Sequence, residues 1–156
     1  MPAKKPATTI TGACGEHYIA AYLSGFGLVV AIPRHGTPNF DLLVANDKGG
    51  HAICLQVKTG RKAYENRKTE GEIYLWDTPR TVIELDDENL WYAYVWLNGW
   101  PDNGNLPQVF FVPSKRVVQC IKKDKGKRTF FWMYADEARK YRGRLGLDSL
   151  INALDT

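Results

Sequence analysis

Residues 38–58, which read PNFDLLVANDKGGHAICLQVK, decide the fold that the sequence predicts. Apolar runs at about Phe40–Ala45 and about His51–Lys58 are each typical of a β-strand. Between them, NDKGG at 46–50 supplies the Asn, Asp and Gly residues that favour the tight turn of a hairpin. We therefore predict two antiparallel strands joined by a short turn.

Polar side chains interrupt both strands of this hairpin. Asp41 stands in a strand whose two faces are otherwise apolar, where a charge is costly to bury. In the next strand, alternation places Gln56 and Lys58 on one face with Ala52 and Cys54. Each residue alone has a structural explanation, since a strand-end Asp can cap a neighbouring backbone and a Lys can extend to solvent. Together they indicate a site.

A helix is expected before the hairpin, at about 13–24. Steps of three and four residues from Glu16 reach Ile19, Ala20 and Leu23, so this carboxylate lies on the apolar stripe. A carboxylate in that position must be paired, hydrogen-bonded or bound to a metal. The alternative is an acidic residue near the start of a helix, where the helix dipole favours it.

Oxygen donors and a lysine are the groups that hydrolysis of a phosphodiester requires, because a hard cation needs oxygen ligands and the transition state needs positive charge. The order of Glu16 on a helix, Pro38-Asn39-Phe40-Asp41, and Gln56-Val57-Lys58 resembles the PD-(D/E)XK nuclease superfamily, which includes Holliday junction resolvases and many restriction endonucleases. The Asp and the Lys are matched, whereas two residues separate Pro38 from Asp41, and Gln56 stands where the family usually has Asp or Glu. The match spans about residues 12–60.

The resemblance implies an α/β domain, a mixed β-sheet with a central antiparallel hairpin flanked by helices. It also implies that Asp41, Gln56 and the Val57 carbonyl bind Mg²⁺ or Mn²⁺, that Glu16 binds it directly or through water, and that Lys58 acts on the attacking water. The implied function is a metal-dependent endonuclease acting on nucleic acid, with DNA favoured. Because Gln56 removes one negative charge from the site, the alternative is a nucleic-acid-binding or assembly module that no longer cuts.

The rest of the chain predicts one domain, residues 11–156, after a flexible arm at 1–10, because no repeat or linker interrupts it. Ser114 is expected to be the N-cap of its helix. The further elements are strands at about 27–32, 73–76, 90–97, 108–112 and 129–134, and helices from Ser114 to about 122 and at about 147–154.

Basic residues are grouped along the chain, which carries a net charge of +4. Such groups are either solvated faces or sites that neutralise phosphates. One group directly follows the hairpin and the second lies in the C-terminal third. The residues expected to bind nucleic acid are Arg61, Lys62, Arg67 and Lys68 in the first group, and Lys122, Lys123, Lys125, Lys127 and Arg128 in the second.

Other classes of protein are disfavoured. No stretch reaches the roughly 18 apolar residues of a membrane span, and the basic start is not followed by an apolar run, so we expect a cytoplasmic protein without a membrane partner. Cys14, Cys54 and Cys120 form no zinc-binding spacing, which favours reduced thiols.

The aromatic strand at 90–97 carries Trp91, Tyr92, Tyr94 and Trp96. These side chains could stack on bases. Because alternation distributes them over both faces of the strand, packing in the core or in a homodimer interface is favoured. A protein–protein interaction domain that uses this strand is a third hypothesis.

Overall fold

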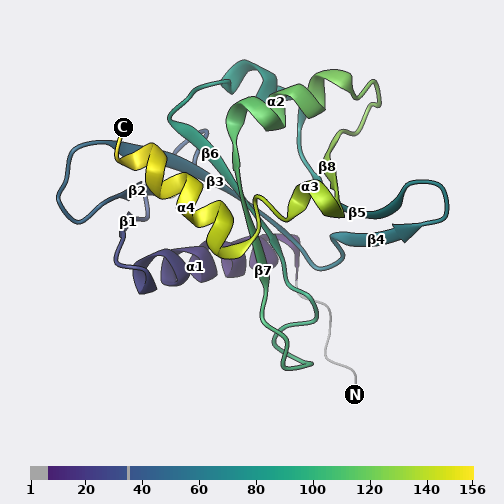
Figure 1. Ribbon diagram of the computed structural model, residues 1–156, viewed down its shortest axis with the longest axis horizontal. Helices are drawn as coiled ribbons and strands as arrows, with labels where there is room; N and C mark the ends of the chain where they lie inside the picture. The colour runs from purple at the N-terminus through teal and green to yellow at the C-terminus, as the bar shows by residue number, and fades with distance from the viewer. Residues whose placement is uncertain (1–6, 35) are drawn as a thin grey trace.

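A five-stranded mixed sheet forms the middle of the molecule in the computed structural model, which describes residues 7–34 and 36–156 (Figure 1). The strand order is β1-β2-β3-β6-β7, with β3 at the centre. β2 and β3 are the predicted antiparallel hairpin, and β3 pairs in parallel with β6. The strands are β1 (Val29–Ala31), β2 (Leu42–Ala45), β3 (Ala52–Gly60), β6 (Leu90–Trp96) and β7 (Gln108–Pro113).

Two helices pack on one face of this sheet, α1 (Thr8–Gly25) and α4 (Gly143–Leu154). The odd-numbered residues of β3, among them Leu55, share a buried apolar core with Ile19 of α1 and Leu150 of α4. Alternation directs the even-numbered residues of β3 away from this core. The face of β3 that carries Gln56 and Lys58 is therefore the one opposite to α1.

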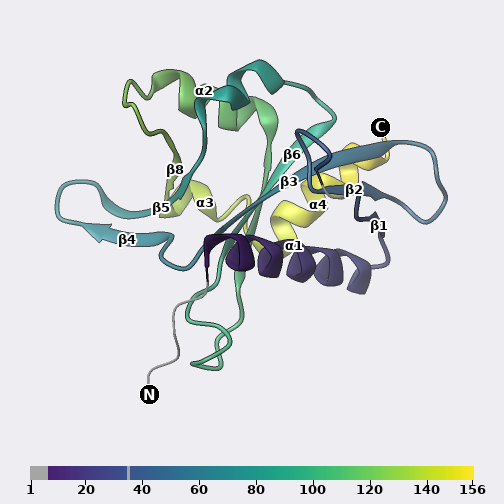
Figure 2. The same cartoon turned by 180° about the vertical axis from the view of Figure 1, so that it is seen from behind.

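The second face is covered by α2 (Ser114–Lys123) and by a smaller sheet of three antiparallel strands, ordered β4-β5-β8. Figures 1 and 2 show the β4–β5 hairpin extending from one side of the molecule. Aromatic side chains of β6 and of the smaller sheet form a common core, so both sheets belong to one domain. The elements are β4 (Tyr64–Arg67), β5 (Gly71–Asp77), a 3-10 turn η1 (Arg80–Leu85), β8 (Phe130–Tyr134) and a short helix α3 (Ala135–Ala138).

Several boundaries differ from the sequence-based expectation. Helix α1 begins at Thr8 and so includes the end of the expected arm, of which residues 1–6 lie outside the described part. Helix α4 begins earlier than expected, at Gly143, and β4 was not predicted. Ser114 is the first residue of α2 and not its N-cap; its hydroxyl donates to the Leu85 carbonyl at 3.4 Å.

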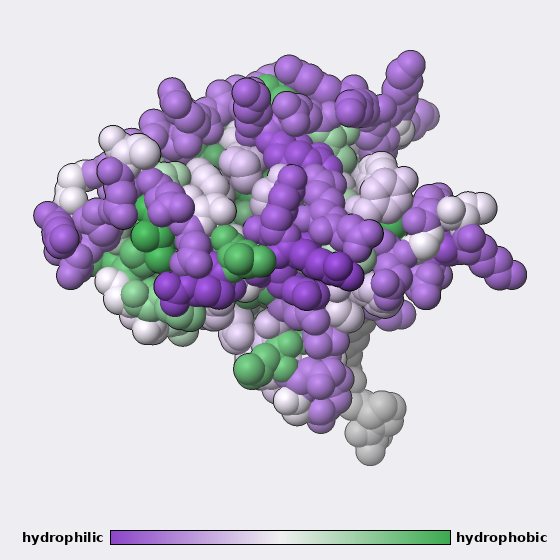
Figure 3. All heavy atoms as spheres, in the orientation of Figure 1, coloured by the Kyte–Doolittle hydropathy of each residue, from purple (hydrophilic) through white to green (hydrophobic). Residues whose placement is uncertain are grey.

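β2 is covered on one face only, contrary to the expectation of two buried faces. Leu42 and Val44 are fully buried against the α1 side, whereas Leu43 is 38% exposed. Figure 3 shows a largely hydrophilic surface in this orientation, with apolar atoms gathered near α1 and α4. Exposed apolar side chains of these elements include Phe26 and Leu145.

The aromatic strand β6 lies in the core, as alternation favoured. Tyr92 and Tyr94 are fully buried, and Trp91 is 8% exposed. β3 and β7 cover its edges and the two apolar cores cover its faces, so that Trp96 alone of its four aromatic side chains is half-buried and the other three are not accessible to bases or to another protein. Base stacking by β6 and the interaction domain built on it were therefore wrong. The three cysteines are free thiols, as expected, and none of the described helices has the length and apolarity to cross a membrane.

Candidate active site

Asp41 marks the point where pairing between β2 and β3 ends. Its backbone N–H donates to the Leu55 carbonyl at 2.9 Å, and the Val57 N–H donates to its carboxylate oxygen Oδ2 at 2.7 Å. The preceding Asn39 has a φ of 75°, which Asn tolerates better than most residues, and this turns the chain into β2. A side-chain oxygen thus replaces the next backbone acceptor of the ladder. The carboxylate is half-buried and fixed against β3.

The Val57 carbonyl points toward the same edge of β3. In a strand, the N–H and C=O of one residue point to the same side. Since the Val57 N–H meets Asp41 on the β2 side, its carbonyl also points there, beyond Leu42, the first residue of β2. A backbone oxygen and a carboxylate are thereby directed to the region beyond the end of β2.

Gln56 and Lys58 complete this group on β3. Alternation places Gln56 and Lys58 on one face of β3, and both side chains are half-buried. The register ends where Leu42 pairs with Leu55, and Asp41 is joined to β3 by its hydrogen bonds to Leu55 and Val57. Asp41 therefore lies beside the segment of β3 that carries Gln56 and Lys58.

Glu16 lies on α1, which packs on the face of the sheet opposite to Gln56 and Lys58. The buried stripe of α1 passes through Gly15 and Ile19, and Glu16 lies beside it, half-buried. Gly15 permits a close approach, because a Cβ there would lie 1.7 Å from Thr59 Oγ1 of β3. Glu16 thus follows directly after a residue at which α1 lies close against β3. It is not on the face of Gln56 and Lys58.

The oxygen atoms that could bind a cation come from the carboxylates of Asp41 and Glu16, the Gln56 amide and the Val57 carbonyl. Across residues 7–34 and 36–156, no three carboxylate, imidazole or thiol side chains come together as a metal centre would require. A cation at this position would depend on the neutral oxygens of Gln56 and Val57. Hard cations accept such oxygens together with carboxylates, so the set fits Mg²⁺ in kind.

A cleft of about 730 Å³ lies beside the end of β3. Thr11 and Gly12 line it from α1, and Trp76 lines it from β5. Its basic lining residues are Lys58, Arg61, Lys62 and Arg128, and its acidic ones are Glu65 and Asp77. The excess of positive charge suits a phosphate backbone. Val57 and Lys58 line this cleft, whereas Asp41, Gln56 and Glu16 are not among its lining residues.

Comparison with solved structures identifies the architecture. The chain is similar to the bacterial homing endonuclease I-Ssp6803I, with a TM-score of 0.56 and 15% identity over 96% of this chain and 97% of that one. It is also similar to Hjc, a Holliday junction resolvase from Archaeoglobus fulgidus, with a TM-score of 0.50 and 12% identity over 88% and 95% of the two chains. The chain therefore shares the fold of these two nucleases. No family model and no curated protein matches the sequence.

On this nuclease-like fold, the predicted basic groups separate. Arg61, Lys62 and Arg128 line the cleft with Lys58, and the Arg61 Nε donates to Thr11 Oγ1 at 3.4 Å. Arg67 and Lys68 lie at the β4–β5 turn, where Arg67 pairs with Glu65 at 2.7 Å and with Glu70 at 3.8 Å. Lys122, Lys123, Lys125 and Lys127 are exposed at the end of α2 and in the loop that follows it.

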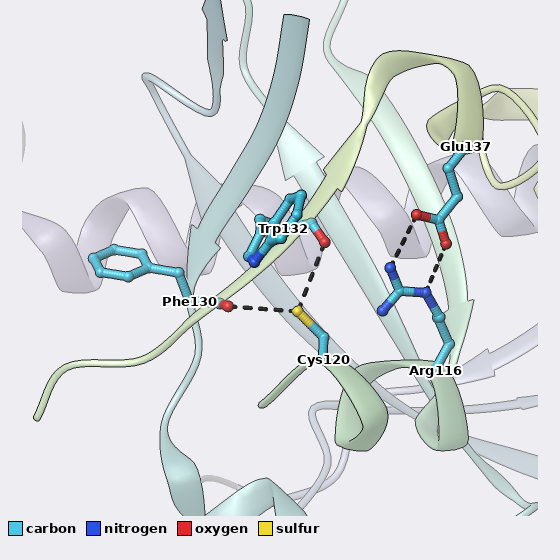
Figure 4. A network of polar contacts seen from close by, with 5 residues as sticks. All are labelled: Arg116, Cys120, Phe130, Trp132 and Glu137. Carbon is cyan, nitrogen blue, oxygen red and sulfur yellow. Dashed lines mark hydrogen bonds and ion pairs between the residues drawn. The ribbon is translucent and has the colours of Figure 1, made fainter. Parts of the chain in front are cut away.

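Arg116 has a structural role in this fold. Its guanidinium donates to both carboxylate oxygens of Glu137, at 2.6 and 2.9 Å, and joins α2 to α3 (Figure 4). This pairing lowers the pKa of the Glu137 carboxyl. In the same view, the Cys120 thiol lies 3.7 Å from the carbonyl oxygens of Phe130 and Trp132, so α2 covers the outer edge of β8.

Some residues around the cleft were not predicted from the sequence. Phe130 and Asp77 line it, and the Arg128 Nε donates to Asp77 Oδ2 at 2.7 Å. Alternation along residues 130–134 could have indicated Phe130, since it separates buried Phe131 and Met133 from the more exposed side chains between them. Nothing local in the sequence pairs Asp77 with Arg128, because β5 and β8 are far apart in the chain.

Proposed function

We propose that this protein is a divalent-metal-dependent endonuclease that hydrolyses phosphodiester bonds, with DNA as its substrate. The observation that carries the proposal is the hydrogen bond of 2.7 Å from the Val57 N–H to Asp41. This bond fixes a carboxylate on the edge of β3 toward which the Val57 carbonyl points, and Gln56 and Lys58 flank Val57 in the same strand. The nuclease-like fold supports this assignment.

The proposed cation ligands are Asp41, Gln56 and the Val57 carbonyl, with Glu16 binding directly or through water. A bound Mg²⁺ supplies stabilisation of negative charge on the scissile phosphate and on an attacking water. Lys58 would orient that water, or stabilise the transition state, through its ammonium donors. The half-buried position of Lys58 limits its exposure to solvent, which strengthens its interaction with an anion.

Nicking of supercoiled plasmid tests the proposal, in Mg²⁺, in Mn²⁺ and in EDTA. Lys58→Ala and Asp41→Asn should each lower the cleavage rate at least about 100-fold, as loss of a group that stabilises the transition state does. Asn at position 41 keeps an oxygen that can accept from the Val57 N–H, so the fold is preserved. Lys48→Ala, at the exposed β2–β3 turn, is the matched control and should cut normally. Cleavage by Lys58→Ala at the wild-type rate would refute the assigned role.

The basic residues of the cleft are proposed to bind phosphates. Replacing Arg61 and Lys62 by Gln should flatten the plot of log affinity against log salt, by about 0.9 for each phosphate of duplex DNA that the variant no longer neutralises. The matched variant removes charge at Lys122, Lys123, Lys125 and Lys127, outside the cleft lining. If the salt slope changes equally in both variants, the cleft has no special part in binding. If it changes in the second variant alone, the interface lies at the end of α2.

A nucleic-acid-binding or assembly module that no longer cuts is the second candidate, and Gln56 favours it because it lowers the charge of the site. Calorimetry with Mg²⁺ on the wild type and on Gln56→Glu separates the two candidates. Binding of the cation by both proteins, together with nicking, supports the enzyme. Retention of DNA without cation binding or cleavage in either protein supports the module.

Homodimer formation stays a prediction. Exposed apolar side chains at the ends of α1 and α4, including Phe26 at 45% and Leu145 at 61%, offer a surface for it. Light scattering of the wild type and of Phe26→Asp would test this surface, since a buried charge should dissociate a dimer formed there.

A further inference from the structure

The smaller sheet has an aromatic outer face. Along β8, Phe131 and Met133 point into the core, so Phe130, Trp132 and Tyr134 point outward. Trp132 is 37% exposed and Tyr134 is 47% exposed. Their rings meet edge to face, with centroids 5.1 Å apart and planes at 89°. Two large aromatic side chains are therefore partly exposed on the outer face of β8.

The neighbouring strand adds one partly exposed residue to this surface. Leu75 of β5 lies opposite Trp132 and is half-buried, whereas Ile73, opposite Tyr134, is buried. Helix α2 runs along the outer edge of β8, where the Cys120 thiol meets two of its carbonyls, so another strand cannot add there (Figure 4). A ligand can therefore contact β8 at its outer face but cannot pair with its outer edge. We call Phe130, Trp132 and Tyr134 the aromatic face.

This aromatic face continues into the basic cleft. Phe130 and Leu75 line the cleft together with Lys58. The Arg128 guanidinium lies over the Phe130 ring, 5.2 Å from its centroid, and donates to Asp77. A chain that lies along the cleft and leaves it past Phe130 meets Trp132 next.

We propose that the aromatic face binds unpaired nucleotides of the strand whose phosphates occupy the cleft. This inference rests on the proposed function and adds to it the class of substrate: nucleic acid with a single-stranded segment beside the cleavage site. Aromatic side chains stack on the faces of bases, which are available only where bases are unpaired. Reading a duplex groove instead requires hydrogen-bonding side chains, and the aromatic face carries none of the Asn, Gln or Arg residues used for that purpose.

Charge selects this occupant over an apolar one. The cleft that borders the aromatic face carries four basic residues against two acidic ones. An apolar peptide or a second copy of this surface would bring no compensating negative charge. A polynucleotide supplies phosphates for the cleft and rings for the aromatic face in the same molecule.

Fluorescence anisotropy in EDTA, where no metal-dependent cleavage occurs, tests the proposal with labelled DNA. One probe is a blunt duplex, and the other is the same duplex with a four-nucleotide single-stranded overhang. The wild type should bind the overhang more tightly. Trp132→Ala should lose about 5- to 100-fold in affinity for the overhang, the usual loss for one stacked base, and almost nothing for the blunt duplex.

Two substitutions at the same position separate stacking from packing. Trp132→Phe keeps a ring face and should retain most of the affinity, whereas Trp132→Leu keeps apolar bulk and should behave like Trp132→Ala. Leu106→Ala is the control, since Leu106 is an exposed apolar residue in the loop between β6 and β7, outside the cleft lining. Equal loss on both probes, or equal behaviour of the Phe and Leu variants, would overturn the proposal.

Photo-crosslinking of the wild type avoids any effect of substitution on folding. An overhang that contains 5-iodouracil should form its adduct with the peptide that carries Trp132 and Tyr134. An adduct confined to other peptides would exclude the aromatic face. If the wild type cuts DNA but no aromatic variant changes overhang binding, this inference fails alone. If the overhang preference holds without cleavage, the proposed catalysis fails and the binding surface stands.

Discussion

The closest contact between α1 and β3 makes Gly15→Ala a severe test of the structure. A Cβ at this position would lie 1.7 Å from Thr59 Oγ1, 2.9 Å from Thr59 Cβ and 3.1 Å from Thr59 Cγ2. Rotation of the Thr59 side chain about χ1 can move Oγ1 away, but it leaves Cβ at 2.9 Å and so relieves the clash only in part. The helix must therefore shift away from the strand.

The expected cost follows from two opposing effects. Overpacking at a well-packed contact costs about 1–3 kcal/mol, and a separation of 1.7 Å places this site at the upper end. Alanine is favoured over glycine within a helix by about 1 kcal/mol. The free energy of unfolding should thus fall by about 2 kcal/mol, and the melting temperature by roughly 4–8 °C for a domain of this size.

Thr59→Ala should relieve most of this cost. The substitution removes Oγ1 and Cγ2, and Oγ1 is buried without a hydrogen-bond partner among the described residues, so its loss should be tolerated. In a double-mutant cycle, the coupling between Gly15→Ala and Thr59→Ala should reach about 1–2 kcal/mol. Gly12→Ala is the matched control in the same helix, since a Cβ there meets no atom within 4 Å.

Urea unfolding followed by circular dichroism measures these free energies, and plasmid nicking measures the functional effect. A shift of α1 also displaces Glu16, and misplacement by about 1 Å can cost on the order of 100-fold in rate. If Gly15→Ala is as stable as the wild type, or if Thr59→Ala leaves its penalty unchanged, the helix does not approach the strand as described.

Three further predictions concern other sites. Burial and the nearby Asp86 raise the pKa of Tyr92 to about 12, so the stability that its neutral form contributes below the unfolded value of about 10 should be lost as pH rises toward 12. The Tyr92 hydroxyl has no hydrogen-bond partner among the described residues. In urea unfolding at pH 7, Tyr92→Phe should therefore be as stable as the wild type or up to about 1 kcal/mol more stable, and it should lose the alkaline dependence. Clear destabilisation of Tyr92→Phe would contradict this prediction. The Arg116 guanidinium lowers the pKa of Glu137, so the pair stabilises the fold above the ordinary carboxyl pKa and loses that contribution as pH falls through the lowered value. Glu137→Gln should therefore cost about 2 kcal/mol at pH 7, with a smaller difference from the wild type in acid; a difference independent of pH would argue against the pair. Finally, Gln56→Glu should lower the Mg²⁺ concentration for half-maximal nicking, on the order of tenfold, because it adds a charged ligand; an unchanged titration would remove position 56 from the cation site.

The sequence predicted the elements whose residues are decided by local pattern. The hairpin was found because its apolar runs flank a turn-forming segment, and β6 was found from its aromatic composition. Strand β4 was not predicted, because Tyr64–Arg67 is polar and mostly exposed and forms a strand through its pairing with β5. The start of α1 was not predicted, because Thr8, Thr9 and Ile10 are β-branched and weak helix formers.

The candidate site was predicted only where alternation suffices. The shared face of Gln56 and Lys58 follows from the period of a strand. The bond from the Val57 N–H to Asp41 depends on the turn at Asn39, and nothing in the periodicity encodes it. Basic residues that are close in the chain also separated in space, since Arg128 lines the cleft while Lys122 and Lys123 lie at the end of α2.

The order in which the chain is made has a consequence for the cleft. Strand β5 pairs with β8, although α2 and two strands of the main sheet lie between them in the sequence. Synthesis proceeds from the N-terminus, so Glu16, Asp41 and Lys58 are in place long before Arg128 and Phe130 have been added. A nascent chain carries every residue proposed to cut while it still lacks one wall of the cleft. The proposed binding cleft is therefore completed last, when the chain is nearly fully synthesised.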